Sequence, residues 1–411
     1  MSSTFLALGA PPAIADRLAA RGILEPFPIQ AATLADAMAG RDVCGKAPTG
    51  SGKTIAFGIP LVARIGVASP RRPKGLVLVP TRELAAQVAD ELKELGGKKG
   101  PSVVSIYGGV GFGPQIAALR KGVDILVACP GRLADLISQG QLKLDEVELV
   151  VIDEADRMAD MGFLPEVKRL LDTVRPDRQT LLFSATLDGD VDVLVKRYQH
   201  DPVRHELAVD EDAKQNRHIF WKMDRAERVD VLAKVVNAEW PTIVFCRTKH
   251  GADRLTKQLA RTGVSAAAIH GDRSQGQRDR ALASFSSGKV QALIATDVAA
   301  RGIHVDDVAA VVHFDPPGSE KDYIHRSGRT GRAGATGIVV SLVDKDQVDG
   351  ASDLQRKLGF EPELHWPDVT ALGDDRHAAQ PLTSAPPRKP AATPRSQQPH
   401  RSRGRGRGPR R

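Results

Sequence analysis

Residues 47–54 read APTGSGKT, and they stand between a short apolar run and a helical pattern. A glycine-rich turn that joins a strand to a helix directs backbone N–H groups at an anion beyond the helix N-terminus. Gly50 and Gly52 allow that close approach, the Lys53 ammonium reaches the outer phosphates, and the Thr54 hydroxyl can ligate Mg²⁺. The run therefore predicts a phosphate-binding loop within an α/β domain built on a mostly parallel sheet.

The rest of the chain repeats this alternation of short apolar runs and helical patterns. Its 411 residues, 41% of them apolar, exceed the roughly 250–300 residues at which a single core stops growing, so we expect two domains. The polar and acidic residues 201–216 lack a strong period and are predicted to form a linker. The clearest helical patterns of the second half are residues 249–261 and 274–286. The expected strands are residues 42–47, 75–80, 102–107, 124–129, 149–153 and 180–185 before the linker, and 218–223, 242–246, 265–270, 290–297, 309–314 and 337–343 after it.

Cysteine usage, hydropathy and charge indicate the compartment of the protein and the class of its partners. Cys44, Cys129 and Cys246 form no CxxC pair, which indicates reduced thiols rather than a zinc site or a disulfide framework. No run reaches the roughly 18 apolar residues of a membrane span, and the first residues lack a signal-peptide pattern, so we expect a cytoplasmic protein. Residues 388–411 carry nine Lys and Arg and no acidic residue. We expect this arm to be disordered and to bind RNA without reading its sequence.

A strand that ends in two carboxylates supplies the second motif, LVVIDEAD, residues 149–156. Asp153 is expected to hold Mg²⁺ through water, and Glu154 to position or deprotonate an attacking water. Together with the phosphate loop, this pair predicts the transfer of a phosphoryl group to water.

Three arginines recur at three-residue spacing in HRSGRTGRAG, residues 325–334. Arg326, Arg329 and Arg332 are predicted to share roughly one helical face, where like charges repel unless an anion lies among them. Arg329 and Arg332 have the character of arginine fingers, which raise phosphoryl-transfer rates by about 10³–10⁵-fold. Because they belong to the second half of the chain, we expect full catalysis to require closure of the two halves.

These residues together resemble one family closely, the DEAD-box ATP-dependent RNA helicases of the bacterial type. The similarity covers roughly residues 5–345, and the motifs occur in the family's order: GILEPFPIQ, APTGSGKT, PTREL, GG, CPGR, DEAD, SAT, IVFCRT, ATDVAARG and HRSGRTGR. The resemblance implies two RecA-like P-loop domains of the α/β class with parallel sheets, joined by a short linker and followed by a disordered basic tail. The implied divisions are a Q-motif region (1–31), an ATP-binding domain (32–205), a linker (206–216), a C-terminal helicase domain (217–368) and the tail (369–411).

The same resemblance implies a site for ATP and Mg²⁺ with a role for each motif. Gln30 would read the adenine edge, with Phe5 supporting it, and the SAT motif would link hydrolysis to closure. The implied catalytic residues are Lys53, Asp153, Glu154, Arg329 and Arg332; the nucleotide-binding residues are Phe5, Gln30, Ala47, Pro48, Thr49, Gly50, Ser51, Gly52, Lys53, Thr54, Asp297 and Gly302; the metal ligands are Thr54 and Asp153; and the coupling residues are Asp156, Ser184, Thr186, His325 and Arg326.

An RNA surface follows from the resemblance as well. Small residues, hydroxyls and backbone amides hold phosphate and 2′-OH groups without reading bases, so binding should be sequence-nonspecific and should favour RNA over DNA. Single-stranded and duplex RNA are the expected partners, ribosomal and RNA-degradation proteins are open as further partners, and nothing in the chain requires more than a monomer. The implied RNA-binding residues are Pro80, Thr81, Arg82, Gly108, Gly109, Pro130, Gly131 and Arg132 in the first domain, and Arg247, Thr248, Gly271 and Thr296 in the second.

Four positions depart from the family pattern. Ile23 stands where an aromatic residue usually stacks on adenine, and Phe27 replaces a threonine of the same block. Cys129 replaces a threonine, which removes a hydroxyl that could contact an RNA phosphate, and His304 replaces an aspartate near the ribose. These changes bear on affinity for ATP and RNA more than on the reaction, because the implied catalytic residues are all present.

The expected activity is RNA-stimulated hydrolysis of ATP to ADP and phosphate, coupled to local RNA unwinding or to remodelling of RNA–protein complexes. Two alternatives are open: an ATP-gated RNA clamp in which unwinding is incidental, and a DNA helicase or translocase with the same core. A metabolic P-loop kinase is disfavoured, because Glu154 suits the activation of water and the chain has no signature of a second substrate pocket.

Overall fold

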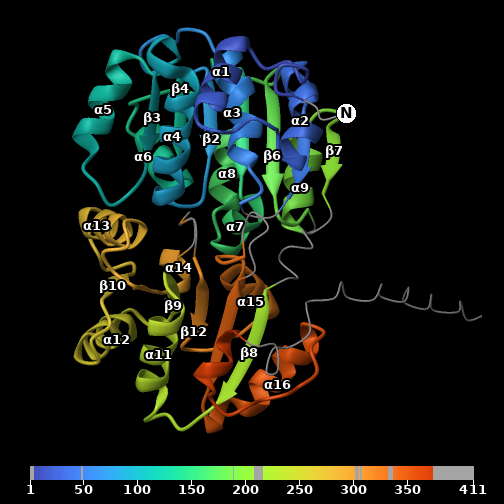
Figure 1. Ribbon diagram of the computed structural model, residues 1–411. Coiled ribbons are helices and arrows are strands. Elements are labelled where there is room, and N and C mark those ends of the chain that lie inside the picture. Colours follow the sequence, from blue (N-terminus) through green and yellow to red (C-terminus); the bar gives the residue numbers. More distant parts are fainter. Residues whose placement is uncertain are drawn as a thin grey trace, which may run out of the picture.

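Two parallel sheets form the centres of two α/β domains, which Figure 1 shows one above the other. The computed structural model describes residues 4–47, 50–187, 189–207, 216–300, 305, 308–331 and 337–373. The first-domain strands are β1 (Val43–Lys46), β2 (Gly75–Leu78), β3 (Val103–Ile106), β4 (Ile125–Ala128), β5 (Leu149–Asp153), β6 (Gln179–Ser184) and β7 (Val203–Glu206). Its helices are α1 (Pro12–Ala20), α2 (Pro28–Met38), α3 (Lys53–Arg64), α4 (Arg82–Gly96), α5 (Phe112–Lys121), α6 (Pro130–Ser138), α7 (Ala155–Asp160), α8 (Leu164–Leu171) and α9 (Asp190–Tyr198), with a 3₁₀ turn η1 (Gly97–Lys99).

The second domain follows the same plan. Its strands are β8 (Arg217–Lys222), β9 (Thr242–Phe245), β10 (Ala266–Ile269), β11 (Ala292–Ala295), β12 (Ala310–His313) and β13 (Ile338–Val343). Its helices are α11 (Arg228–Ala238), α12 (Lys249–Arg261), α13 (Gln275–Ser286), α14 (Asp297–Ala300), α15 (Glu320–Ser327) and α16 (Val348–Lys357), with 3₁₀ turns η2 (Lys345–Gln347) and η3 (Val369–Gly373). The tail predicted at 369–411 begins with an ordered turn, since Val369–Gly373 forms η3 and Leu372 is buried in the second-domain core. The rest of the tail, from residue 374, and linker residues 208–215 lie outside the described residues.

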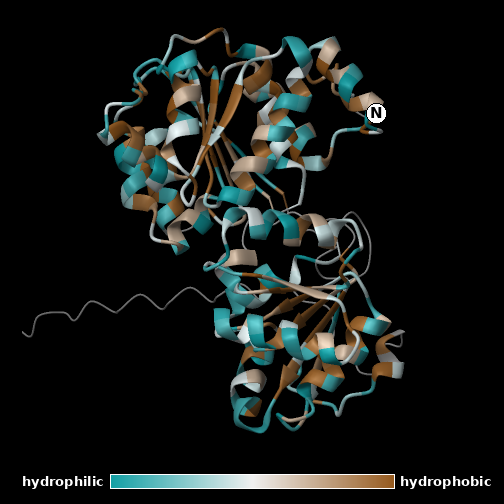
Figure 2. Ribbon diagram, turned by 90° about the vertical axis from the view of Figure 1, so that its left-hand side faces the viewer, coloured by the Kyte–Doolittle hydropathy of each residue, from teal (hydrophilic) through white to brown (hydrophobic). Residues whose placement is uncertain are grey.

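The order of the strands places the motifs relative to one another. The first sheet runs β3-β4-β2-β5-β6-β1-β7 and the second β10-β11-β9-β12-β13-β8, with parallel pairing throughout. Strands buried on both faces read as nearly continuous apolar runs, and every expected strand is present. Figure 2 shows these apolar strands between helices whose outer sides are hydrophilic. Because parallel strands end at the same edge, the segments after β1, β5 and β6 share one half of that edge in the first domain, and those after β2, β3 and β4 share the other.

One segment differs from the expectation from sequence. Val203–Glu206 lies within residues 201–216, which were expected to form a linker, yet it forms β7 and pairs with β1. The backbone N–H of Val203 donates to Asp42 O at 2.9 Å, and Lys46 Nζ lies 3.3 Å from a Glu206 carboxylate oxygen. An edge strand has a solvated side, so its residues alternate in exposure instead of forming an apolar run. The polar composition of Val203–Glu206 is therefore the reason why the sequence did not predict this strand.

Two buried histidines predict that the second domain loses stability in acid. His218 Nδ1 lies 2.8 Å from the Tyr323 hydroxyl, and His313 Nδ1 lies 3.1 Å from Ser341 Oγ. Burial lowers the pKa of His218 to about 3 and also lowers the pKa of His313. The unfolded chain takes up protons at these sites below about pH 6.5, whereas the folded chain does not, so the free energy of unfolding falls as pH decreases.

We expect a lower urea midpoint at pH 5 than at pH 7, with His218 alone contributing about 2 kcal/mol to the difference. The variant His218→Phe keeps a ring beside Tyr323 and Phe360 but cannot take up a proton, so its midpoint should depend less on pH. Equal pH dependence of the variant and the parent chain would contradict this account.

Candidate functional site

The phosphate loop lies where β1 passes into α3. Gly50 and Gly52 have φ angles of 89° and 85°, which favour glycine, and Lys53 begins the helix. Lys53 is buried, and its Nζ donates to Ala47 O at 2.8 Å, so the ammonium lies across the loop that it is expected to complete. Ser51 and Thr54 are partly buried in the same turn, whereas Pro48 and Thr49 lie outside the described residues.

The segment before α2 rests against this loop. Gln30 Nε2 donates to Gly52 O at 2.9 Å, and Gln30 Oε1 accepts from the backbone N–H of Phe27 at 2.9 Å. Gln30 is fully buried and thus joins the start of α2 to the loop. Phe5 is buried in the apolar core, so its ring is not exposed to solvent. Ile23 packs against the same core cluster.

The acidic motif follows β5, beside the phosphate loop. Glu154 has φ 52° and ψ 50°, a left-handed conformation that costs a non-glycine residue on the order of 1–3 kcal/mol and that clusters at functional sites. Its Oε2 is buried and accepts no hydrogen bond within the described residues. Arg157 Nη1 lies 4.0 Å from this oxygen and forms an ion pair with it. The backbone N–H of Asp156 donates to Ser184 Oγ at 3.1 Å, which joins the end of β6 to this motif. Thr186 follows, partly buried.

The charge balance of these carboxylates fits a divalent cation. Burial raises the pKa of Asp153 to about 7, an effect that the nearby Lys53 opposes. Asp156 Oδ2, like the Glu154 oxygen, is buried and accepts no hydrogen bond among the described residues. A cation would stabilise all three carboxylates. In the described part of the chain, no group of three or more His, Cys, Asp or Glu side chains is arranged to hold a metal ion.

The arginines of the second domain do not share one helical face. Helix α15 ends at Ser327 and is capped by Gly328, so Arg326 lies in the helix and Arg329 in the turn that follows. The prediction of a common face is therefore wrong, because glycines end the helix between the arginines. Gly302, His304 and Arg332 lie outside the described residues.

Arg326 makes a two-pronged contact across the second domain. Its Nε and Nη2 donate to the two carboxylate oxygens of Asp297 at 2.6 and 2.7 Å, and its Nη1 donates to Asp315 O at 2.8 Å. This fork positions Asp297 at the start of α14.

A pocket between the domains collects residues from both. Arg157 comes from the first domain and His325, Arg326 and Arg329 come from the second, with Arg329 buried. Burial, together with the nearby Arg157 guanidinium, lowers the pKa of His325 to about 4, so the imidazole stays neutral at pH 7. The exposed pair of Lys321 with Asp160, 2.6 Å apart, adds another contact between the domains at this side.

The other half of the first sheet edge carries the motifs expected to bind RNA. The Thr81 hydroxyl caps α4 by accepting from Leu84 N, and Gly109 has φ 80°. That φ favours glycine, and the absence of a side chain leaves room for the end of Arg82, whose Nη1 would lie 2.3 Å from a β-carbon on Gly109. Arg132 Nη1 donates to Val110 O at 2.9 Å and thereby ties the CPGR motif to the GG loop. The remaining members of this set follow the strand ends: Pro80 after β2, Gly108 after β3, and Pro130 and Gly131 at the start of α6.

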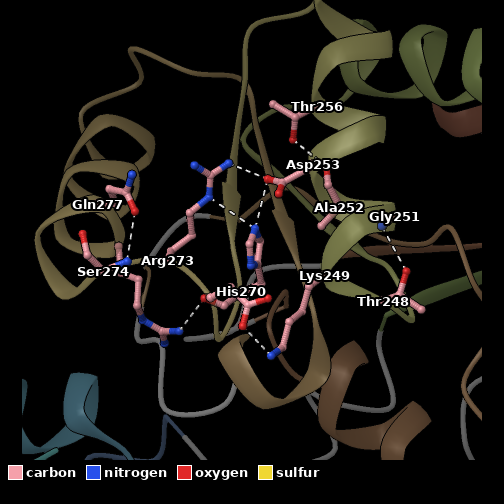
Figure 3. Close-up of polar contacts among 12 residues, drawn as sticks. Thr248, Lys249, Gly251, Ala252, Asp253, Thr256, His270, Arg273, Ser274 and Gln277 are labelled. Atoms are coloured by element: carbon pink, nitrogen blue, oxygen red, sulfur yellow. Dashed lines mark hydrogen bonds and ion pairs between the residues drawn. The ribbon is translucent and has the colours of Figure 1, made fainter. Parts of the chain in front are cut away.

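Figure 3 shows the corresponding surface of the second domain, between α12 and the loop after β10. Thr248 caps α12 by accepting from Gly251 N at 3.0 Å, and Lys249 Nζ pairs with Asp272 at 2.6 Å. A β-carbon on Gly271 would lie 3.3 Å from Lys249 Cε, so glycine lets the lysine cross the loop. The last two expected residues are Arg247, exposed after β9, and Thr296, buried after β11.

Reasoning from the sequence missed the buried charged contact between the domains. Arg278 Nε donates to Glu83 Oε1 at 2.6 Å, and both side chains are buried. Gln275 Nε2 lies 3.4 Å from the same carboxylate oxygen, and Arg82 Nη1 lies 3.4 Å from Gln275 Oε1. Figure 1 shows α13, which carries Gln275 and Arg278, directly below the first domain. The only signal in the sequence was Glu83 itself, an acidic residue beside the expected RNA residues.

Comparison with known proteins identifies the family. Residues 27–194 match the DEAD/DEAH box helicase family, and residues 222–334 match the helicase conserved C-terminal domain. The chain is 41% identical to DEAD-box ATP-dependent RNA helicase 30 of Arabidopsis thaliana, covering 88% of this chain and 63% of that one. It is 40% identical to helicase 20 of the same plant over 90% of this chain and 76% of that one. It is 39% identical to the helicase CshA of Geobacillus kaustophilus, covering 92% and 82% respectively.

Solved structures agree with the sequence relatives. Saccharomyces cerevisiae Dbp5 bound to RNA and ADP BeF3 is 28% identical, with a TM-score of 0.78 over 91% of this chain and 97% of that chain. A DEAD box protein of Methanococcus jannaschii is 35% identical, with a TM-score of 0.52 over 89% and 99%. With the matched domains, the motif order and the geometry above, the chain belongs to the DEAD-box family of ATP-dependent RNA helicases.

Proposed function

We propose that this chain hydrolyses ATP to ADP and phosphate in response to RNA, and that closure of its two domains separates RNA strands locally. The observation that carries the proposal is the division of the sheet edge of the first domain. In the first domain, the segments after β1, β5 and β6 suit a nucleotide, and those after β2, β3 and β4 suit an RNA backbone. Likeness to a Dbp5 structure that holds both RNA and ADP BeF3 supports the binding of these two ligands by one protein.

In the proposed mechanism, each named side chain has one task. Lys53 neutralises the outer phosphates, and the buried carboxylate of Glu154 orients a water and accepts its proton. Thr54 and Asp153 would hold Mg²⁺, which supplies positive charge to the phosphate oxygens. Arg329, with Arg332, would stabilise the charge that develops on the transferring phosphoryl group.

Closure of the two domains is favoured by the nucleotide and by RNA, because each ligand contacts residues of both domains. Arg329 can reach the nucleotide only when the domains meet, and the RNA motifs of both domains can hold one strand only in that arrangement. Release of phosphate removes the anion that the arginines hold, so the domains reopen. Because Thr81, Gly109, Thr248 and their neighbours present hydroxyls and backbone groups, the strand should be held without reading of its bases.

The experiment that tests this function compares ATP hydrolysis without nucleic acid, with a single-stranded RNA, and with a DNA of the same length and sequence. We expect RNA to raise kcat/KM for ATP by about 5–150-fold, the usual size of coupling between two sites, and DNA to have less effect. A rate that does not respond to RNA would contradict the proposal, and stronger stimulation by DNA would favour the DNA helicase.

An ATP-gated RNA clamp is the second candidate, favoured by the buried contact of Glu83 with Arg278, because a buried pair that joins the domains would hold them together around RNA. Measurement of strand release and RNA residence in one preparation separates the two. Slow release of RNA with little strand separation would indicate a clamp, and strand separation that keeps pace with ATP turnover would indicate a helicase.

Several expectations stay predictions. They are the divisions at residues 31, 205, 216 and 368, the cytoplasmic location, the monomeric state, and contacts with ribosomal or RNA-degradation proteins. Among the residues that the structure describes, no helix has the length and apolar character needed to cross a membrane.

A further inference from the structure

Helix α12 presents a row of basic side chains to solvent. The row follows spacings of four, three and four residues, which place its members on one side of a helix with 3.6 residues per turn. The buried side chains of α12 lie on the opposite side and pack in the second-domain core. The members of the row are all exposed, and we call them the α12 ridge: His250, Arg254, Lys257 and Arg261.

The ridge lacks acidic partners. The only acidic residue of α12, Asp253, pairs with His270 and Arg273 instead, as Figure 3 shows. Among the residues that the structure describes, no member of the ridge forms an ion pair. Like charges three or four residues apart on a helix repel, and cations in its first turn oppose the helix dipole. Because a surface that only keeps a protein soluble mixes charges of both signs, the ridge is suited to an anionic partner.

The surroundings of the ridge favour RNA over an acidic protein as that partner. Helix α12 begins directly after Arg247 and its N-cap Thr248, both of which are expected to contact RNA. Protein interfaces are depleted in lysine and are anchored by apolar or aromatic side chains. The only exposed apolar side chain of α12 is Ala260, so the ridge offers no such anchor. An RNA backbone requires only a row of cations.

The length of the ridge suits a nucleic-acid strand. From His250 to Arg261 the helix rises roughly 16 Å, at about 1.5 Å per residue. Phosphates of one strand are spaced about 3.4 Å apart along the axis of a stacked helix, so the ridge extends along about five of them. Successive cations of the ridge can therefore meet phosphates of one continuous strand.

We propose that the α12 ridge binds the phosphate backbone of RNA that continues beyond the nucleotides held by the motif residues. The inference rests on the proposed function, because the ridge extends the same RNA site past Thr248. Arg254 and Arg261 pair with phosphate oxygens through their guanidinium groups, and Lys257 contributes a point charge between them. These contacts read no bases, so they add affinity for longer RNA without changing the hydrolysis of ATP.

The test measures dissociation constants of the full chain, with ADP and beryllium fluoride, for uridine-only RNAs of increasing length at several salt concentrations. The ridge variant combines Arg254→Gln, Lys257→Gln and Arg261→Gln. We expect it to bind the shortest RNA that stimulates ATP hydrolysis as the parent chain does, and to lose affinity only for longer RNA. For a long RNA, the slope of log affinity against log salt concentration should be smaller by about 2, at roughly 0.7 for each lost phosphate contact.

A matched control removes the same charge from other parts of the second domain. It combines Lys234→Gln on α11, Lys289→Gln after α13 and Lys357→Gln on α16, all at exposed lysines. The control should bind long RNA with the parent's affinity and salt slope. Both variants keep residues 388–411, so any contribution of that tail to binding is the same in both. Thermal unfolding of the ridge variant should occur at or above the parent's temperature, because repulsion along α12 is relieved.

Three outcomes would overturn the inference. Parent affinity of the ridge variant for every RNA length would show that the ridge does not touch RNA and would leave an acidic protein as its partner. Equal losses in the ridge variant and the control would show that net charge alone acts. Weaker binding of the shortest RNA would show that the substitutions disturb the motif residues. Stimulation of ATP hydrolysis by the shortest RNA tests the proposed function without the ridge, so the two fail separately.

Discussion

Replacement of Glu154 by glutamine is expected to lower the rate of RNA-stimulated ATP hydrolysis by about 10²–10⁴-fold, the usual contribution of a general base. Glutamine has nearly the same shape but cannot accept a proton from water. The buried Oε2 of Glu154 accepts no hydrogen bond among the described residues and lies 4.0 Å from Arg157, so it can accept a hydrogen bond from a water. Steady-state phosphate release at saturating RNA measures the loss.

Binding should survive this substitution. We expect Glu154→Gln to retain affinity for ATP and RNA and to hold RNA longer than the parent chain, since hydrolysis no longer triggers reopening. The control is Glu166→Gln, at an acidic residue of α8 that pairs with Arg169 on the surface and should leave the rate unchanged. Hydrolysis by Glu154→Gln at the parent rate would assign proton acceptance to another group.

Replacement of Glu83 by glutamine is expected to impair domain closure while leaving each domain folded. Its carboxylate accepts from Arg278 at 2.6 Å, and the two side chains are 4% and 6% exposed. Removal of one member of a buried ion pair costs about 3–5 kcal/mol, because the other charge stays buried without a partner. Here the cost falls on the closed arrangement, since opening returns Arg278 to water. Closure should therefore be disfavoured by about 10²-fold or more, at tenfold per 1.4 kcal/mol.

The readout is the RNA concentration that gives half-maximal ATP hydrolysis, which should rise in Glu83→Gln, while thermal unfolding should stay close to that of the parent chain. The pair of Lys321 with Asp160 provides the matched control, because it also joins the domains but is 45% and 30% exposed. Lys321→Ala should change closure little, since exposed pairs contribute about 0.2–1 kcal/mol. If the two substitutions had equal effects, burial of the Glu83–Arg278 pair would not make that pair more important for domain closure than the exposed pair.

The sequence by itself determined twelve of the strands and the clearest helices of the second domain. Apolar runs and glycine turns act over a few neighbouring residues, so α12, predicted at 249–261, has those bounds in the structure. The same locality explains the errors. The polar edge strand β7 depends on its partner β1, and the end of α15 depends on a glycine cap that the spacing of arginines does not reveal.

Only the tertiary structure decided which residues meet across large sequence separations. Glu83 and Arg278 lie 195 residues apart, and no local pattern pairs them. Phe5 and Phe27 are equally apolar in the sequence, yet packing buries the first and leaves the second beside Gly52. The left-handed conformation of Glu154 is likewise imposed by its surroundings, since no neighbouring residue calls for it. The physical reason is common to these cases: burial and domain contact arise from the folded chain as a whole, whereas hydrogen-bonded turns and strand propensity arise from adjacent residues.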